Sequence, residues 1–180
     1  MPRLIAFLRA INVGGHTVTI ARLREEFEAL GLKDVETFIA SGNVIFTARQ
    51  ADTVALEKKI EARLHEALGY EVATFVRTCE EVAAVAGYRP FPGVRIDGDA
   101  TVYVGFVDRP LDAADTRAVM TFKTEVDDFR VRGREVYWLR KTRLTESPFK
   151  YVSLEKKLKI RVTFRGINTV ARLAAKHGPS

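Results

Sequence analysis

The sequence predicts an α+β protein in which one order of elements, βαββαβ, occurs twice and is followed by a C-terminal helix. Apolar residues recur every three or four positions in some segments, as on one face of a helix, and form shorter strand-like runs in others. Glycine, proline and capping residues stand at the ends of most of these segments. With 180 residues, of which 47% are hydrophobic, the chain can bury a sizeable core.

The first half of this fold is expected over residues 1–77. Each of its two helices is predicted from an apolar stripe that a glycine follows: Ile20, Leu23, Phe27 and Leu30 before Gly31, and Leu56, Ile60, Leu64 and Leu68 before Gly69. Thr17 or Thr19 can cap the first helix, and Asp52 can cap the second. Strands are expected over residues 4–11, 35–40, 43–48 and 71–77, and the middle two form a hairpin at Ser41-Gly42.

Residues 78–98 are expected to form a short helix followed by a linker. Thr78 and Glu81 have the spacing of a capping box, and Gly87 can end the helix. Prolines and glycines then gather between residues 90 and 98. Because these residues punctuate structure more strongly than any others, this loop is the best candidate for a boundary in the chain.

The second half, residues 99–180, repeats the order of elements without obvious sequence identity to the first. Strands are expected over residues 100–107, 126–131, 135–140 and 160–164. Helices are expected from residue 112 to about residue 122, over 147–158, and over 167–177 at the end. Asp112 can cap the first of these helices, and Ser147-Pro148 can begin the second.

The order βαββαβ is that of the split-βαβ, ferredoxin-like arrangement, so the sequence predicts two tandem ferredoxin-like halves. Right-handed crossovers place strand three antiparallel between strands one and two. The loop after strand one and the turn between strands two and three then leave the sheet at the same edge. We therefore expect Asn12–His16 and Ser41–Asn43 to come together, although they are distant in the sequence.

Two runs in the first fifty residues are the most specific motifs of the chain: Phe7-Leu8-Arg9-Ala10-Ile11-Asn12-Val13-Gly14-Gly15-His16 and Ile39-Ala40-Ser41-Gly42-Asn43-Val44-Ile45-Phe46. They resemble the signature of the bacterial family catalogued as domain of unknown function 1697 (DUF1697). Thr163, Arg165 and Thr169 also match the closing motif of the family, whereas Gly166 and Ile167 stand where asparagine and tryptophan are usual. The loss of that aromatic residue argues against a stacking role for this segment. The resemblance implies a fold and a pair of glycine turns, but no reaction, because the family has no agreed activity.

The segments that carry the resemblance are also the best candidates for a ligand site. Gly14-Gly15 lies between a strand and a helix, where free backbone N–H groups and the helix dipole can receive an anion. A small anionic or phosphorylated ligand is therefore the first hypothesis, and its candidate binding residues are Arg9, Asn12, Gly14, Gly15, His16, Ser41, Gly42, Asn43, Thr163 and Arg165. Three simpler alternatives stay open: the glycines only form turns, Arg9 is a buried partner to a carboxylate, and Asn168 or Thr169 caps the last helix.

Charge is distributed unevenly along the chain, whose net charge is +6. Residues 129–180 carry 14 lysine and arginine residues against 3 acidic ones. Part of this charge lies on a predicted hairpin that contains Tyr137 and Trp138 among six basic residues: Arg130, Arg132, Arg134, Arg140, Lys141 and Arg143. The hairpin supports a second hypothesis, a nucleic-acid-binding module, although a solvated hairpin with one buried tryptophan is the simpler interpretation. A protein-interaction module that uses spare sheet faces is the third.

Catalytic and metal-binding patterns are poor, so the sequence leaves open whether the protein is an enzyme. Its three histidines are scattered, and Cys79 is the only cysteine, which excludes a disulfide or a thiolate zinc site within the chain. We expect no metal and no cofactor, and we interpret Asp127-Asp128 as a solvated turn. No apolar stretch approaches the ~20 residues of a membrane helix, and no signal-peptide pattern is present, so a cytoplasmic location without membrane contact is expected.

Overall fold

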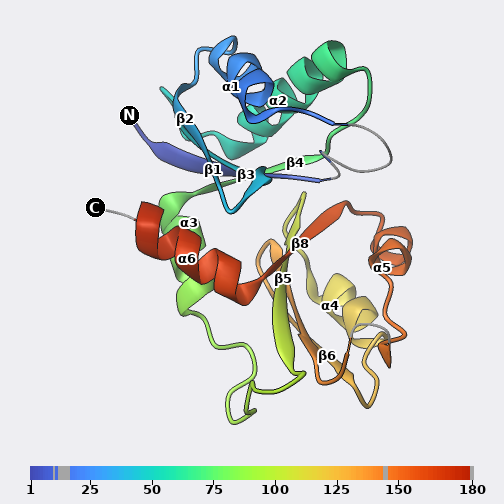
Figure 1. Cartoon of the computed structure of the whole chain (residues 1–180). Helices are drawn as coiled ribbons and strands as arrows, with labels where there is room; N and C mark the ends of the chain where they lie inside the picture. Colours follow the sequence, from blue (N-terminus) through green and yellow to red (C-terminus); the bar gives the residue numbers. More distant parts are fainter. Residues whose placement is uncertain (10, 12–16, 144–145, 179–180) are drawn as a thin grey trace. The chain divides into compact units, whose positions relative to one another are not determined.

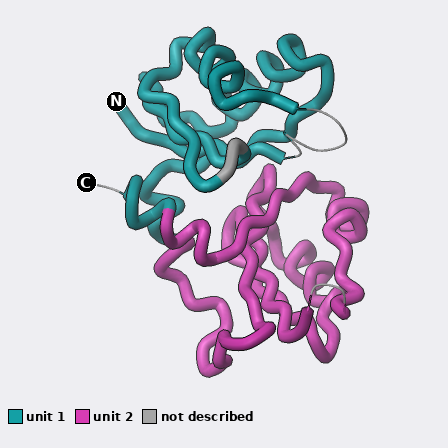
Figure 2. The backbone as a smooth tube through the Cα atoms, viewed as in Figure 1, with its two compact units in different colours: residues 1–84, 173–180 teal, residues 85–172 magenta. Residues whose placement is uncertain are grey.

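The computed structural model of the chain describes residues 1–9, 11, 17–143 and 146–178; at Ala40 and Ser41 it describes the backbone alone. The chain divides into two compact units, which Figure 2 shows in different colours: unit 1 is Met1–Ala84 with Leu173–Ser180, and unit 2 is Val85–Arg172. Helices and two four-stranded antiparallel sheets are both present, so the predicted α+β class is confirmed.

Unit 1 contains a sheet with the strand order β2-β3-β1-β4. Its elements in chain order are β1 (Arg3–Leu8), α1 (Ile20–Glu28), β2 (Lys33–Phe38), β3 (Ala40–Thr47), α2 (Thr53–Leu68) and β4 (Thr74–Thr78), as Figure 1 shows. Strand β3 lies antiparallel between β1 and β2, as the crossover rule predicts. Phe7 of β1 stands opposite Asn43 of β3, so the end of β1 and the start of β3 meet at one edge of the sheet. Residues 12–16 lie outside the described residues, so the expected approach of Asn12–His16 to Ser41–Asn43 stays a prediction.

The two helices of unit 1 lie on one face of the sheet because their apolar stripes are buried there (Figure 1). Leu23 and Phe27 of α1 join Leu56 and Ile60 of α2 in one core cluster with residues of the strands. The Phe27 ring meets the Phe46 ring edge-on, with 5.7 Å between their centroids. This burial removes most of the apolar surface of both helices from water, which is the main force that holds a short helix in place.

Local capping chemistry sets the ends of these helices. Thr19 accepts a hydrogen bond from the backbone N–H of Arg22 at 3.1 Å, and Asp52 accepts one from that of Ala55 at 3.0 Å. Gly69 follows α2 with a φ of 81°, a left-handed conformation that costs glycine little. The predicted caps Thr19 and Asp52 are therefore confirmed.

The capping box predicted before the short helix α3 (Cys79–Gly87) is also present. The N–H of Thr78 donates to the Glu81 carboxylate at 2.8 Å, and the N–H of Glu81 donates to the Thr78 hydroxyl at 3.1 Å. The two bonds satisfy backbone donors that would otherwise have no partner at the start of the helix.

The hairpin between β2 and β3 turns earlier than predicted. Strand β2 ends at Phe38 and β3 begins at Ala40, so Ser41 and Gly42 lie within β3 and the turn is at Ile39, whose φ is 67°. The side-chain amide of Asn43 donates to the carbonyl of Phe38 at 3.1 Å. This bond satisfies the last carbonyl of β2 and helps to hold the tight turn without a glycine at its left-handed position.

Unit 2 contains a second antiparallel sheet, with the strand order β6-β7-β5-β8, so its strands occupy the same relative places as those of unit 1. Its elements are β5 (Thr101–Val107), α4 (Ala113–Met120), β6 (Asp127–Arg132), β7 (Glu135–Arg140), α5 (Tyr151–Leu158) and β8 (Val162–Gly166). Val119 of α4 and Leu154 and Leu158 of α5 pack with Phe129 and Trp138 in its core. The final helix, α6 (Ile167–His177), follows β8 directly and begins in unit 2.

Two predictions in unit 2 were wrong, and one buried carboxylate explains both. Asp127 is 0% exposed, so it is no solvated turn, and Asp128 beside it is buried as well. One oxygen of Asp127, Oδ1, accepts hydrogen bonds from the Trp138 indole N–H at 2.8 Å and from the Ser147 hydroxyl at 2.7 Å. Because Ser147 binds Asp127, it does not start a helix, and α5 begins only at Tyr151.

None of the helices within the described ranges is both long enough and apolar enough to cross a membrane.

Candidate functional site

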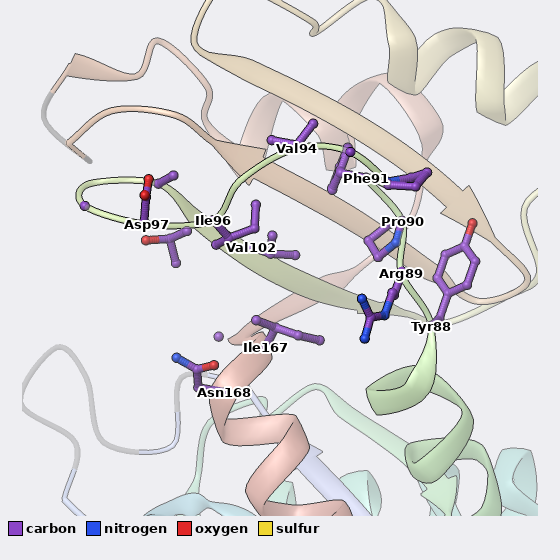
Figure 3. A pocket seen from close by; sticks show the side chains of 16 residues that line it. Tyr88, Arg89, Pro90, Phe91, Val94, Ile96, Asp97, Val102, Ile167 and Asn168 are labelled. Carbon is purple, nitrogen blue, oxygen red and sulfur yellow. The ribbon is translucent and has the colours of Figure 1, made fainter.

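A pocket of about 580 Å³ in unit 2 is the candidate functional site (Figure 3). Three segments form it: the loop 88–98 that follows α3, the beginning of β5 at Thr101 and Val102, and the junction between β8 and α6 at Gly166, Ile167 and Asn168. These segments are distant in the sequence and meet because β8 pairs with β5, with Gly166 opposite Tyr103. The pocket therefore follows from the topology of the sheet.

Most of the pocket wall is apolar. Phe91 and Val102 form buried parts of it, at 7% and 6% exposure, whereas Val94 and Ile96 remain 42% and 44% exposed. In Figure 3 the side chains of Ile96 and Val102 lie close together at the centre of the view. Two large aliphatic side chains left in water beside a concave apolar surface leave apolar area that a ligand can cover.

The polar groups of the pocket come from the loop and from the start of α6. Figure 3 shows the Arg89 guanidinium pointing from the loop toward Ile167, with Asn168 on the other side of that residue. Arg89 is exposed, and no described residue gives its guanidinium a hydrogen bond or an ion pair. Gly166 precedes α6 and has no side chain that could cap the first N–H groups of the helix. These donors favour a negatively charged group.

Asp97 carries the only carboxylate among the described residues that line the pocket, and a neighbouring cation pairs with it. Its Oδ2 lies 2.6 Å from Nε of Arg95, and both side chains are largely exposed. The carboxylate is thus paired with Arg95, which leaves the guanidinium of Arg89 and the helix start as the groups that attract an anion.

Thr163 and Arg165 lie on β8 just before this junction, but neither lines the pocket. Nη1 of Arg165 donates to the Thr163 hydroxyl at 2.7 Å and to the carbonyl of Phe164 at 3.0 Å. Burial lowers the pKa of Arg165 to about 10, so its guanidinium still carries a charge at neutral pH. The two predicted ligand residues therefore contact each other, and the pocket is lined instead by the three residues after Arg165.

The basic hairpin of unit 2, β6 and β7, packs its cations against aromatic rings. Three guanidinium groups lie over ring faces: Arg130 over Phe91 at 5.1 Å, Arg132 over Tyr88 at 4.4 Å and Arg140 over Tyr103 at 5.2 Å from the centroids. Tyr137 and Trp138 are only 1% and 6% exposed, so neither ring presents a face on which a base could stack.

The first 137 residues match a family model described as "Protein of unknown function (DUF1697)". The chain belongs to this family. A solved structure described as that of a conserved bacterial protein from Streptococcus pneumoniae is also similar: the two chains are 23% identical, 98% of each is covered, and the TM-score is 0.77. At this identity the likeness shows the fold alone. No curated protein matches the chain.

Of the eight candidate ligand residues in the DUF1697 signature, four lie outside the described residues and a fifth is described by its backbone alone. Asn12, Gly14, Gly15 and His16 fall outside the described residues, and Ser41 is described by its backbone alone. Arg9 is half-buried, and its backbone N–H donates to the carbonyl of Ala73 at 2.9 Å. Asn43 is 2% exposed and uses its amide within its own turn. A ligand site at this edge of the DUF1697 fold therefore stays a prediction.

Sequence reasoning missed Arg89, Val94, Ile96 and Asn168 as site residues, because it treated the loop 88–98 as a linker and Asn168 as a helix cap. One signal was available: Val94 and Ile96 are large apolar residues in a segment otherwise rich in proline and glycine. Among the residues that the structure describes, no group of three or more histidine, cysteine or acidic side chains is placed to hold a metal ion.

Proposed function

We propose that this member of the DUF1697 family binds a small organic molecule with an apolar body and one anionic group, in the pocket between the loop 88–98 and the start of α6. The observation that carries the proposal is the combination of exposed Val94 and Ile96 with an Arg89 guanidinium that has no described partner, all on one concave surface. The volume of about 580 Å³ lies within the usual range of small-molecule pockets.

The charge of the pocket supports one negative group and argues against a polyphosphate. Among the described residues that line the pocket, Arg89 is the only cation and has no acidic partner, and the start of α6 adds the partial positive charge of a helix dipole. A carboxylate between Arg89 and Asn168 would receive donors from both sides. The apolar body of such a ligand would then cover Val94 and Ile96.

We further propose that each unit is a ferredoxin-like fold and that the protein acts in the cytoplasm. The strand orders β2-β3-β1-β4 and β6-β7-β5-β8, each with two helices in βαββαβ order, support the first statement. The buried free thiol of Cys79 is compatible with a reducing compartment and supports the second.

A ligand panel read by thermal melting and then by titration calorimetry tests the pocket. Aliphatic and aromatic carboxylates should raise the melting temperature of the wild type, because a ligand that binds the folded state stabilises it. Arg89→Gln should weaken binding about five- to tenfold, the effect of a lost charge-assisted hydrogen bond at a partly solvated site. Ile96→Asp should weaken it at least as much, because it places a second carboxylate beside the apolar body of the ligand.

Arg117→Gln is the matched control, since Arg117 is an exposed arginine of α4 in the same unit and does not line the pocket. It should bind as the wild type does. The proposal fails if no carboxylate shifts the melting temperature, or if Arg89→Gln and Arg117→Gln change the affinity equally.

A further inference from the structure

A second pocket, of about 520 Å³, lies in unit 1 and is lined by three cationic side chains, those of Lys33, Arg49 and Lys59. The amide side chain of Gln50 also lines it, and none of the described residues on its wall is an aspartate or a glutamate. Leu56 and Ile60 of the apolar core also line it, and they are 4% and 0% exposed. Positive charge is thus gathered around a concave surface.

The fold of unit 1 brings the three cations together from separate elements. Lys33 is the first residue of β2 and stands opposite Thr47, the last residue of β3, so the chain that leaves β3 carries Arg49 back toward Lys33. Lys59 lies in α2, one residue before the buried Ile60. This end of the sheet is opposite to the edge where Phe7 meets Asn43.

These cations differ from others of unit 1 because no acidic residue in the described part of the chain pairs with them. Arg22 and Arg63 both contact Glu26, at 2.9 and 2.5 Å, and Arg3 contacts Glu36 at 2.7 Å. In contrast, no described residue forms an ion pair or a side-chain hydrogen bond with Lys33, Arg49 or Lys59. Like charges around one pocket repel each other, and an anion with several negative charges would relieve that repulsion.

We infer that this pocket binds a small phosphorylated molecule. Two ammonium groups and one guanidinium suit the tetrahedral oxygens of a phosphate or diphosphate, because lysine acts as a point charge and arginine donates in a planar fork. A single carboxylate would leave most of this charge unbalanced. The cations surround one concavity of about 520 Å³, which favours a compact ligand over an extended nucleic-acid strand. This site is independent of the pocket proposed in unit 2.

Titration of the isotopically labelled full chain with inorganic pyrophosphate, followed by NMR at low ionic strength, tests the inference. Amide signals of Lys33, Arg49 and Lys59 and their neighbours should shift, and added salt should weaken the binding. Each of Lys33→Gln, Arg49→Gln and Lys59→Gln should weaken binding about two- to fivefold, and the triple variant on the order of ten- to a hundredfold, if exposed charge contacts contribute as they usually do.

Lys58→Gln is the matched control, because Lys58 is an exposed neighbour of Lys59 on the same helix and does not line the pocket. It should leave the affinity close to that of the wild type. Equal losses in Lys58→Gln and Lys59→Gln would overturn the inference, since they would indicate attraction by net charge alone. Shifts confined to other parts of the chain would also overturn it.

A short single-stranded DNA oligonucleotide provides a second arm of the experiment. Binding that is tighter than that of pyrophosphate and is lost in the triple variant would overturn the small-molecule ligand in favour of a nucleic-acid backbone. Weaker binding than pyrophosphate would support the inference.

Discussion

Replacement of Gly105 by alanine should destabilise unit 2, because no space exists for a side chain at this position of β5. A Cβ atom there would lie 2.7 and 2.9 Å from two carbons of the Phe164 ring and 2.9 Å from a methyl carbon of Val162. Optimal separation between carbon atoms begins at about 3.5 Å, so each contact is short by roughly 0.6–0.8 Å. The side chains of Phe164 and Val162 must therefore move to relieve these short contacts.

The Phe164 ring is only partly buried, but two neighbouring rings restrict its movement away from Gly105. It meets the ring of Trp138 at 5.8 Å and that of Phe149 at 6.2 Å, both nearly edge-on. Overpacking of such a core costs about 1–3 kcal/mol, while loss of the glycine lowers the entropy of the unfolded chain and returns about 0.4–1 kcal/mol. The net loss in the free energy of unfolding is therefore expected to be about 1–2 kcal/mol.

Urea unfolding followed by fluorescence measures this loss directly, because Trp138 is the only tryptophan in the chain and lies in the core of unit 2. With a slope of about 2 kcal/mol per molar urea, the midpoint should fall by roughly 0.5–1 M. Gly87→Ala is the control, since a Cβ at Gly87 meets nothing within 4 Å. An unchanged midpoint for Gly105→Ala would refute the argument from close packing.

Two further predictions concern buried polar groups. Burial lowers the pKa of His177 more than nearby Glu36 raises it, so the contribution of His177 to stability is complete above its ordinary pKa of 6.5 and is lost as the pH falls below that value. Between about pH 7.5 and pH 5.5, the melting temperature should fall more for the wild type and for the exposed-site control His65→Gln than for His177→Gln; equal falls would contradict this. Asp127→Ala should lower the free energy of unfolding by about 2–4 kcal/mol, because it leaves two buried donors, one of them the indole of Trp138, without an acceptor. Asp127→Asn retains an acceptor oxygen and should cost less than half as much in the same fluorescence assay, whereas equal losses would show that charge matters more than the hydrogen bonds.

Elements whose boundaries depend on near neighbours could be predicted from the sequence. The caps Thr19 and Asp52 and the capping box of Thr78 and Glu81 join groups only three residues apart, so their spacing is visible in the sequence. The start of α5 could not be predicted in the same way. Ser147 has the residue type and position of a helix start, but it binds a carboxylate twenty residues earlier in the chain.

The candidate site illustrates the same limit. Gly166, Ile167 and Asn168 lie in the segment that resembles the closing motif of the family, so the sequence points to it. In contrast, Arg89 and Ile96 lie in a loop whose composition indicates only a linker. The cations Lys33, Arg49 and Lys59 are likewise not spaced in the sequence in a way that predicts a common site. The residues that line each pocket become neighbours only after strands that are distant in the sequence have paired.

The sequence by itself therefore determined the α+β class, the repeated order of elements, most helix ends and membership of the DUF1697 family, because these depend on periodicity and short-range patterns. Only the tertiary structure decided where the pockets lie, that Asp127 is buried, and which cations have acidic partners. The physical reason is that burial and charge pairing depend on which surfaces meet in space. Strand pairing, such as that of Gly166 with Tyr103 and of Lys33 with Thr47, decides which of these surfaces lie next to each other.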